Sequence, residues 1–525
     1  MMNKKQMHFL GISQIFDLIL TPSSFMAMVK RQHILPPVTD TDAIRSAYVR
    51  QSAFITCLKA NPHHQWKQLF TDLSPLNLPA QSSIFTLPDL FELKSFCYHY
   101  QKLKQAIAKD NLPYPPMPDL QELFNLLDPE KSQLPSFRLS PLFSQELTAL
   151  DALRQAINLK LKHVRHELLC EARQSLDLPN LKESFCLARS EGDLIQILEQ
   201  SPYFVLSAES IANLSFHLAD SAQSNALKHE LSLLNLKIEE EEDWLLQELG
   251  SKINTFRTLL NSALDVAIQI CRDFLLSQFA LDNRCCIPDL ESTPDCQIKM
   301  KGLRNLPLEL SLTQQHRSYQ PLDLCFSSNA NLITGPNMGG KSTLLKALAQ
   351  CAELSRRAIP LPASSASLPY FDFVYYNNEA ETATLSSFGA EVVALHKALQ
   401  KPGKGLFLLD EFSRGTNPYE GEALATAVIA FLAESKHSLV AATHYTKPAS
   451  LKAISHFRIK GIDRLVTRNL SNNLDERLNI LAKAMDYSLI KVTEHSDAPL
   501  DALRVAEILG LPSSILKLAR EHLDE

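Results

Sequence analysis

Glycine is scarce in this chain, and three of the 14 glycines among its 525 residues fall within a single loop. The loop lies in the stretch LITGPNMGGKSTLLKAL, residues 332–348, and its glycines are Gly335, Gly339 and Gly340. Its letters fit the pattern G-x-x-x-x-G-K-[ST], with a short apolar run before it and helical apolar spacing after it. A strand, a tight loop and a helix in this order predict an α/β domain that holds phosphate at a helix N-terminus.

The residue types of this loop match what phosphate binding requires. Glycine lets backbone N–H groups approach phosphate oxygens without a Cβ in the way. Lys341 is expected to reach the β- and γ-phosphates, and the hydroxyl of Ser342 is expected to ligate Mg²⁺. We therefore predict an ATP site with Mg²⁺, formed by Gly335, Pro336, Asn337, Met338, Gly339, Gly340, Lys341, Ser342 and Thr343.

Two further apolar runs end in side chains suited to the same site. GLFLLDEF ends in Asp410, which fits the role of a Mg²⁺ ligand, and Glu411, the candidate base that orients or deprotonates an attacking water. Taken alone, an acidic helix cap explains this pair about as well; beside a phosphate loop, the catalytic interpretation is favoured. His444 ends the run SLVAATH and is the candidate γ-phosphate sensor, although a lone histidine is usually structural. Tyr319 is a candidate for stacking on adenine, with an ordinary loop aromatic as the more frequent explanation.

Apolar spacing predicts a helical part followed by a mixed domain. Up to about residue 296 the spacing is helical, with long helices over 141–175 and 222–280 and shorter helical pieces between them. No alternating pattern there predicts strands, so this part is expected to be all-α. Beyond it, runs such as FDFVYY and GLFLLDE alternate with helical stretches, which predicts a P-loop α/β domain with a mostly parallel sheet.

Composition limits the classes of function. Hydrophobic residues make up 45% and charged residues 21% of the chain, as in ordinary water-soluble globular proteins. The net charge of −6 argues against a generally basic nucleic-acid binder. The N-terminus is not followed by a cleavage site, and the sequence has no apolar run long enough to span a bilayer. We therefore expect no membrane span and a cytoplasmic location.

These motifs together resemble the ATPase domain of the MutS family, within the ABC-type ATPase class. TGPNMGGKST contains Asn337 and Met338, which the family has and a general P-loop does not require. LLDEFSRGTNPYEG resembles the family's Walker B segment, and AATHY its histidine switch. LSSFGAEVVAL is similar to its signature segment, and VAEILGLPSSILKLAREHL to its dimerisation region. A weaker similarity to the family's core and lever extends the resemblance over about residues 120–525.

The resemblance implies a homodimer with two composite ATP sites, in which hydrolysis is coupled to conformational change. Ser386 of one subunit would contact the γ-phosphate held by the P-loop of the other and takes part in catalysis. Asn417 and Pro418 stand where the family has small hydroxyl residues after Walker B. No mismatch-recognition domain is evident at the amino terminus, so we expect a MutS-like protein that lacks it.

The resemblance also assigns the segments of the chain. We expect an N-terminal helical region over 1–120, a core with lever helices over 121–295 and a lever tip near 171–236, an ATPase domain over 296–485, and a helical dimerisation segment over 486–525.

The target of the ATPase is left open between DNA and protein. The lever tip carries four Lys or Arg residues against nine Asp or Glu residues, a local net charge of −5, whereas surfaces that grip duplex DNA neutralise phosphates with cations. On family grounds the favoured hypothesis is an ATP-dependent binder of DNA structures in repair or recombination, without mismatch probing. The alternative is remodelling or reactivation of a protein client, as in MutS-like reactivase subunits for cobalamin-dependent aminomutases. A nucleotide-binding scaffold with little hydrolysis is disfavoured, because the lysine, both carboxylates and the histidine occur together.

Overall fold

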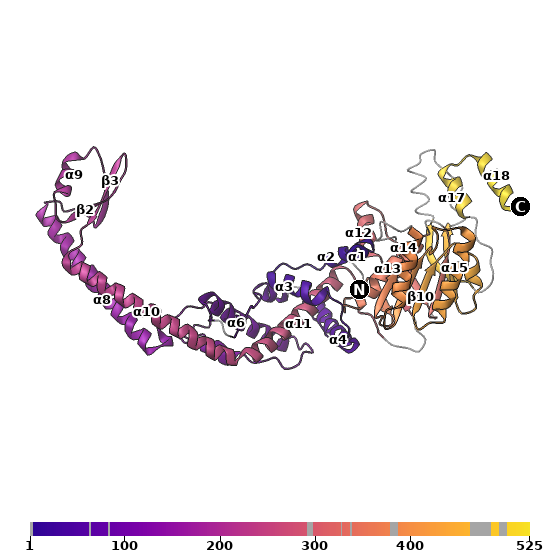
Figure 1. The fold of residues 1–525 in the computed structure, drawn as a ribbon, viewed down its shortest axis with the longest axis horizontal. Coiled ribbons are helices and arrows are strands. Elements are labelled where there is room, and N and C mark those ends of the chain that lie inside the picture. The colour runs from indigo at the N-terminus through magenta and orange to yellow at the C-terminus, as the bar shows by residue number, and fades with distance from the viewer. Residues whose placement is uncertain are drawn as a thin grey trace. The chain divides into compact units, whose positions relative to one another are not determined.

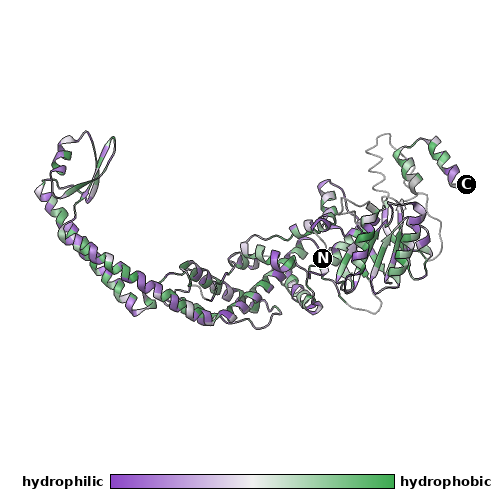
Figure 2. Ribbon diagram, in the orientation of Figure 1, coloured by the Kyte–Doolittle hydropathy of each residue, from purple (hydrophilic) through white to green (hydrophobic). Residues whose placement is uncertain are grey.

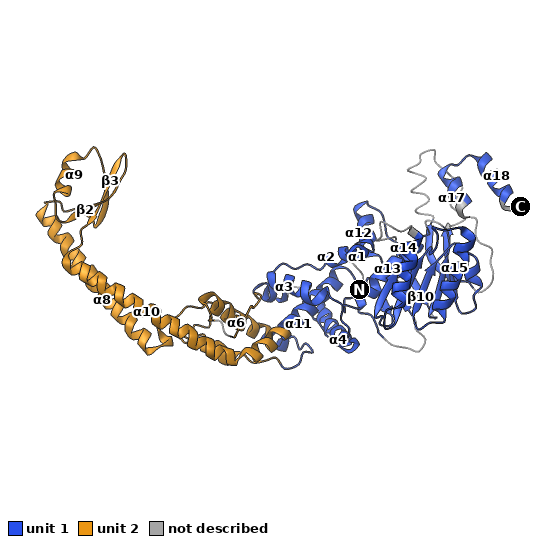
Figure 3. Ribbon diagram, viewed as in Figure 1, with its two compact units in different colours: residues 1–72, 105–116, 266–525 blue, residues 73–104, 117–265 orange. Residues whose placement is uncertain are grey.

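The chain forms two compact units, drawn in blue and orange in Figure 3. The first comprises residues 1–72, 105–116 and 266–525, and the second comprises residues 73–104 and 117–265. The computed structural model describes residues 4–61, 65–81, 84–290, 298–326, 328–336, 339–377, 387–462, 485–492 and 501–524. Within these ranges no helix is long and apolar enough to cross a membrane. The segment boundaries predicted at residues 120, 295 and 485 divide the chain into consecutive segments, whereas each compact unit combines separate stretches of the chain. These boundaries stay predictions.

The second unit is built around two long helices that lie side by side (Figure 1). Its elements in chain order are α6 (Leu87–Lys109), α7 (Gln121–Leu126), η2 (Pro141–Phe143), α8 (Gln145–Ser175), β1 (Ser184–Ala188), α9 (Gly192–Glu199), β2 (Phe204–Glu209), β3 (Asn213–Leu218) and α10 (Ala222–Thr255). Leu147 and Ile157 of α8 pack against Leu234 of α10, and this apolar seam holds the pair together. Both long helices agree with the helical spacing of the sequence.

A three-stranded antiparallel sheet with the order β1-β3-β2 lies between these two helices in the chain. Leu214, Phe216 and Leu218 of β3 are buried with residues of α9, while the other face of the strand is not covered. The prediction of an all-α lever region, with only helical pieces over residues 176–221, was therefore wrong. Only the six residues of β3 alternate cleanly, and β2 exposes every residue after Phe204, so two of the three strands lack the period-two pattern.

The amino-terminal part of the first unit is a helical core. It contains α1 (Lys4–Phe9), α2 (Ile12–Asp17), α3 (Ser24–Val29), η1 (Lys30–Ile34), α4 (Thr41–Ala60), α5 (Trp66–Thr71) and most of α11 (Arg257–Asp282). Asp273 is buried and accepts hydrogen bonds from Arg50 Nε, at 2.6 Å, and from the hydroxyl of Tyr114, at 2.9 Å. Burial raises the pKa of Asp273, which Arg50 opposes. This polar cluster joins α4 to α11 inside the apolar core.

The carboxyl-terminal part of the first unit is an α/β domain. Its elements are β4 (Ile298–Leu303), α12 (Leu306–Gln314), β5 (Leu322–Phe326), β6 (Ala330–Thr334), α13 (Lys341–Ser355), β7 (Ser365–Ser367), β8 (Phe373–Tyr376), α14 (Ser387–Leu399), β9 (Gly405–Asp410), α15 (Pro418–Ala433), β10 (Ser438–Ala442), η3 (Lys447–Ser450), β11 (Ser455–Ile462), β12 (Met485–Lys491), α17 (Asp501–Leu509) and α18 (Ser513–Asp524). A six-stranded sheet has the order β12-β11-β6-β10-β9-β8, parallel except for β12. A smaller antiparallel sheet has the order β5-β4-β7. The mixed helix-and-sheet fold was predicted, and the strands expected from the four apolar runs are β6, β8, β9 and β10.

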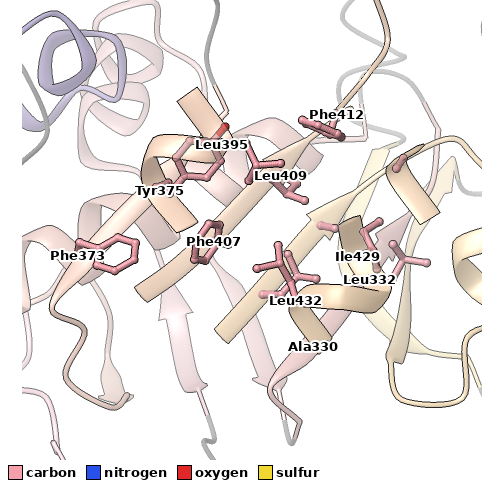
Figure 4. Close-up of a cluster of buried hydrophobic side chains, with 14 residues drawn as sticks. Ala330, Leu332, Phe373, Tyr375, Leu395, Phe407, Leu409, Phe412, Ile429 and Leu432 are labelled. Atoms are coloured by element: carbon pink, nitrogen blue, oxygen red, sulfur yellow. The ribbon is translucent and has the colours of Figure 1, made fainter. Parts of the chain in front are cut away.

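The central strands β6, β9 and β10 of the large sheet are mostly apolar and buried on both faces, and strands of this domain are largely green in Figure 2. On one face, Phe407 and Leu409 of β9 meet Leu395 of α14 and Ile429 and Leu432 of α15 (Figure 4). Helix α13 packs against β8, β9 and β10 from the other face (Figure 1). Strands covered on both faces read as continuous apolar runs, which is why these strands are recognisable in the sequence.

Truncation of Phe407 tests the importance of this core. Phe407 is fully buried, and we expect Phe407→Ala to lower the free energy of unfolding by about 3–5 kcal/mol through lost burial and a residual cavity. Phe431→Ala is the matched control, because Phe431 lies on α15 with 62% of its surface exposed. The two variants are compared by urea unfolding monitored by circular dichroism. Equal midpoints for the two variants would contradict the described core.

Candidate functional site

The candidate site is assembled by three neighbouring parallel strands. Strand β10 lies between β6 and β9, and its last residue, Ala442, is in register with both Ile333 and Asp410. The carboxyl ends of all three strands therefore meet at one edge of the sheet, where ligands bind in open α/β folds. The glycine-rich loop follows β6, the two carboxylates end β9, and His444 follows β10.

The loop between β6 and α13 has the backbone that its glycines predict. Gly335 has φ 145° and Gly340 has φ 84°, values that other residues rarely adopt. Gly340 is the N-cap of α13, and a Cβ on it would lie 3.0 Å from Tyr487 Cδ1. Asn337 and Met338 lie outside the described residues. The loop thus leads directly into the N-terminus of α13, and there is space for a ligand beside that N-terminus.

Lys341, the first residue of α13, points back under this loop. Its side chain is largely buried, and its Nζ donates to the carbonyl oxygens of Gly335, at 2.7 Å, and Pro336, at 3.1 Å. Burial lowers the pKa of Lys341, and the carboxylates of Glu411 and Asp410 oppose that shift. The ammonium is therefore held between the loop and the two carboxylates, at the position where a polyphosphate needs a cation.

Asp410 is held by two residues that follow one another on the neighbouring strand. The hydroxyl of Tyr376 donates to Asp410 Oδ2 at 2.7 Å, and the side chain of Asn377 bonds both the backbone N–H and the backbone carbonyl of Asp410. Burial, and then the charge of Asp410, raise the pKa of Tyr376. The other carboxylate oxygen, Oδ1, is buried with no hydrogen-bond partner among the described residues. Such an atom costs free energy unless a ligand satisfies it.

This orphaned oxygen fits a divalent cation. Ser342 and Asp410 line the same cavity, which Glu391 and Glu411 also line, so the Ser342 hydroxyl and the Asp410 carboxylate face a common space. Mg²⁺ is usually bound by one or two protein oxygens, together with phosphate oxygens and waters. Among the described residues no three or more His, Cys, Asp or Glu side chains are grouped so that they could hold a metal ion by themselves.

Glu411 is fixed by its backbone and by both of its carboxylate oxygens. It has φ 50°, a left-handed conformation that is strained in a residue with a side chain, and its N–H donates to the carbonyl of Ala442 at 2.9 Å. Its Oε1 contacts His444 Nε2, and its Oε2 accepts from Arg414 at 2.7 Å. The structure thus brings together Glu411 and His444, which were predicted separately.

The segment after Glu411 is anchored by α14 and begins α15. Ser413, also left-handed with φ 66°, donates its backbone N–H to Glu391 at 3.0 Å and its hydroxyl to the carbonyl of Gly421 at 2.7 Å. Asn417 caps α15 by accepting from the N–H of Tyr419, at 3.0 Å, and Pro418 occupies the first helical turn. Asn417 and Pro418, which depart from the family pattern, therefore serve as a helix start.

Two cavities lie at the phosphate loop and the start of α13, and their lining residues are all different. One, of about 610 Å³, is lined by Phe9, Ser342, Tyr376, Asn377, Phe388, Glu391, Asp410, Glu411, Arg414 and Gly415. The other, of about 800 Å³, is lined by the loop residues Gly339, Gly340 and Thr343 together with Tyr319, Tyr487, Ile459 and Met485, among others. The hydroxyl of Tyr319 accepts from the N–H of Asn305 at 3.1 Å, which fixes the ring at this cavity.

The site contains residues that the sequence alone did not indicate. Tyr376 and Asn377 bond to Asp410, yet they lie at the end of β8, outside the motifs. Glu391, which accepts from the N–H of Ser413, lies within the signature-like segment LSSFGAEVVAL, but that resemblance assigned it no role. Tyr376 and Asn377 end the run FDFVYYN, on the strand next to the Walker B strand. Their place at the end of that run is the sequence signal from which they could have been found. Ser386, predicted to act on the opposite subunit's nucleotide, lies outside the described residues.

Comparisons with known proteins point to a single family. Residues 331–525 match the family description "MutS domain V". A "DNA mismatch repair protein MutS" of Streptococcus gordonii is 26% identical over 341 residues, 63% of this chain and 34% of that protein. A protein of the same name from Lactobacillus delbrueckii subsp. bulgaricus is 30% identical over 53% of this chain and 30% of its own length. An "Endonuclease MutS2" of Fusobacterium nucleatum is 30% identical over 47% of this chain and 30% of its own length. The match thus covers about a third of the length of these relatives.

Replacement of Gly340 tests whether the loop holds phosphate. A side chain at φ 84° costs roughly 1–2 kcal/mol, and the loop would have to shift away from Tyr487. We expect Gly340→Ala to weaken binding of a fluorescent nucleotide about tenfold, which is the affinity equivalent of ~1.4 kcal/mol. Gly192→Ala is the control, because a Cβ there meets no atom within 4 Å. Unchanged affinity in Gly340→Ala would contradict this site.

Proposed function

This chain belongs to the MutS family, and we propose that it binds ATP with Mg²⁺ at the carboxyl ends of β6, β9 and β10 and hydrolyses it. The observation that carries the proposal is the convergence of the glycine loop, the two carboxylates and His444 at one edge of the sheet. Each group has a different role in phosphoryl transfer, and each is supplied by a different strand.

The phosphates bind in the loop, against the N-terminus of α13. Lys341 exchanges its bonds to the carbonyls of Gly335 and Pro336 for the β- and γ-phosphate oxygens. Ser342 and Asp410 hold Mg²⁺, which neutralises charge on the phosphates when bound. The base and ribose lie in the cavity of about 800 Å³, where Tyr319 is the candidate for stacking on adenine.

Glu411 accepts the proton of the attacking water. Its Oε1 lies against His444 and its Oε2 against Arg414, so the carboxylate has a fixed orientation toward the cavity that Ser342 and Asp410 also line. A base that is already oriented loses little entropy when the water is positioned. His444 is suited to sense the γ-phosphate, because movement of its ring changes the contact with Glu411.

Removal of the base while its shape is kept tests the hydrolysis step. Glu411→Gln keeps the side-chain length but cannot take a proton, so we expect turnover to fall about 10²–10⁴-fold, while ATP affinity remains. Glu420→Gln, on the exposed first turn of α15, is the matched control and is expected to keep wild-type turnover. Phosphate release and nucleotide affinity are measured on both variants. If Glu411→Gln turns over ATP as fast as wild type, Glu411 is not the base.

We further propose that two copies of the chain form composite sites when ATP binds. Support comes from the likeness to MutS proteins and from Arg414, whose side chain is exposed at the cavity that Glu411 also lines. Ser386 of the second copy is the residue we assign to the γ-phosphate. Because ATP is trapped in Glu411→Gln, the same variant is expected to sediment as a dimer with ATP.

For the target, we propose a DNA structure bound in the cytoplasm during repair or recombination, without mismatch probing. The support is the similarity to the proteins from Streptococcus gordonii and Lactobacillus delbrueckii, which are DNA mismatch repair proteins. Contact with DNA would come from the lever tip, and the cations there are the groups that would neutralise phosphates.

A second candidate target is a protein client, and the pairing of charges at the tip favours it. Three of the four tip cations are engaged within the tip: Arg173 donates to the carbonyl of Leu181, Arg189 pairs with Glu209, and Lys228 pairs with Asp220. Breaking such an exposed ion pair costs up to about 1 kcal/mol, which reduces the free energy gained from a phosphate contact. Reactivation of a protein partner, as by MutS-like reactivase subunits for cobalamin-dependent aminomutases, needs no cationic tip.

A DNA titration separates the two targets. Duplex, mismatched and branched DNA are titrated at two salt concentrations, with a non-hydrolysable ATP analogue and with ADP. If DNA is the target, the logarithm of the affinity falls with the logarithm of salt, by about 0.9 per phosphate neutralised. Affinity should also differ between the two nucleotides. Absence of binding at low salt excludes DNA and leaves the protein client.

A further inference from the structure

The turn between α1 and α2 is fastened to the helix that begins at the phosphate loop. The carbonyl of Leu10 accepts from Gln350 Nε2 of α13 at 2.6 Å, and Leu10 is buried. Gly11 has φ 75°, and a Cβ on it would lie 2.8 Å from Pro307 Cγ, so the turn fits closely against α12. The residue just before this turn, Phe9, is therefore held in place although its own side chain is 42% exposed.

Phe9 forms part of the wall of the cavity that contains the candidate metal ligands and base. It lines the same space of about 610 Å³ as Ser342, Asp410 and Glu411. Its ring meets the ring of Tyr376 edge-on, with centroids 6.0 Å apart and an interplanar angle of 62°. An amino-terminal aromatic side chain thus lies within the nucleotide site, although it belongs to none of the motifs.

The face of the Phe9 ring is covered by a lysine that the proposed mechanism does not use. Lys346 Nζ lies 3.9 Å from the ring centroid, well inside the range of a cation–π interaction. Lys346 is one and a half turns after Lys341 on α13, and the charge of Asp410 acts on its ammonium. An ammonium and a carboxylate of opposite charge attract each other, so Lys346 and Mg²⁺ are potential competitors for the Asp410 carboxylate.

The contacts of Phe9 and Tyr376 bear on which carboxylate oxygen of Asp410 is available to a ligand. Tyr376 occupies Oδ2 of the carboxylate, and Oδ1 has no hydrogen-bond partner among the described residues. The Phe9 ring packs against Tyr376 and also binds the ammonium of Lys346. One aromatic side chain therefore contacts both the tyrosine that bonds to Oδ2 and the lysine on whose ammonium the charge of Asp410 acts.

We propose that Phe9 is a positioning residue for the metal: its ring holds Lys346 and Tyr376 so that one carboxylate oxygen of Asp410 stays free to bind Mg²⁺. The inference rests on the proposed ATPase function. It adds a contribution of the amino-terminal helices to that site, acting on metal affinity and not on the phosphate loop.

The test is metal binding measured without hydrolysis. Mn²⁺ is titrated into the full chain with a non-hydrolysable ATP analogue, and free Mn²⁺ is followed by electron paramagnetic resonance. We expect Phe9→Ala to bind Mn²⁺ about tenfold more weakly, whereas analogue binding in EDTA is unchanged. Phe9→Trp keeps an aromatic face and is expected to retain wild-type Mn²⁺ affinity. Phe91→Ala, which removes a phenylalanine of similar exposure at 48%, is the matched control.

A second substitution separates the positioning role from a merely structural one. If Lys346 competes for Asp410 once the ring is removed, Lys346→Gln in the Phe9→Ala background returns Mn²⁺ affinity toward wild type. If Phe9→Ala unfolds, Phe9→Leu preserves apolar volume without an aromatic face and is expected to show the same weaker Mn²⁺ binding. Wild-type Mn²⁺ affinity in Phe9→Ala or Phe9→Leu, or failure of Lys346→Gln to restore it, overturns the inference. Absence of any analogue binding by the wild-type chain would instead overturn the proposed ATPase function.

Discussion

The parallel hydrogen-bonded alignment of β6, β10 and β9 is the constraint on which the candidate site depends. Because Ala442 is in register with Ile333 on one side and Asp410 on the other, the three strands end at the same height. Every functional group of the site leaves the sheet within the next few residues. The apolar cluster around Phe407 stabilises this alignment, so the core of the domain and the geometry of the site have a common origin.

Several groups at this edge are held in arrangements that cost free energy on their own. Glu411 and Ser413 have left-handed backbones, and Asp410 has a buried oxygen without a hydrogen-bond partner among the described residues. Strain and unsatisfied polar atoms persist where the surrounding structure enforces them, and they concentrate at functional sites. Here the surrounding bonds come from Tyr376, Asn377 and the helix-capping segment after Glu411. A bound cation, together with its nucleotide, would satisfy the buried oxygen of Asp410 that has no partner among the described residues.

The sequence was most informative where function requires a fixed spacing along the chain. The glycine loop, Asp410, Glu411 and His444 could be identified because each ends an apolar run that becomes a buried strand. Tyr376 and Phe9 could not, because their place at the site arises only when β8 and the α1–α2 turn pack against α13. The sheet of the second unit escaped prediction for a similar reason. Strand β2 exposes most of its side chains, so its residues lack the alternation that indicates a strand.

We propose that this chain hydrolyses ATP at a site shared between two copies. Single-turnover phosphate release from Mg²⁺-ATP, measured at increasing protein concentration, tests it most directly. With a shared site, we expect a rate per subunit that rises with protein concentration and levels off once the dimer forms. Phosphate release at a rate independent of protein concentration would contradict the shared site, and no release at any concentration would contradict the hydrolysis itself.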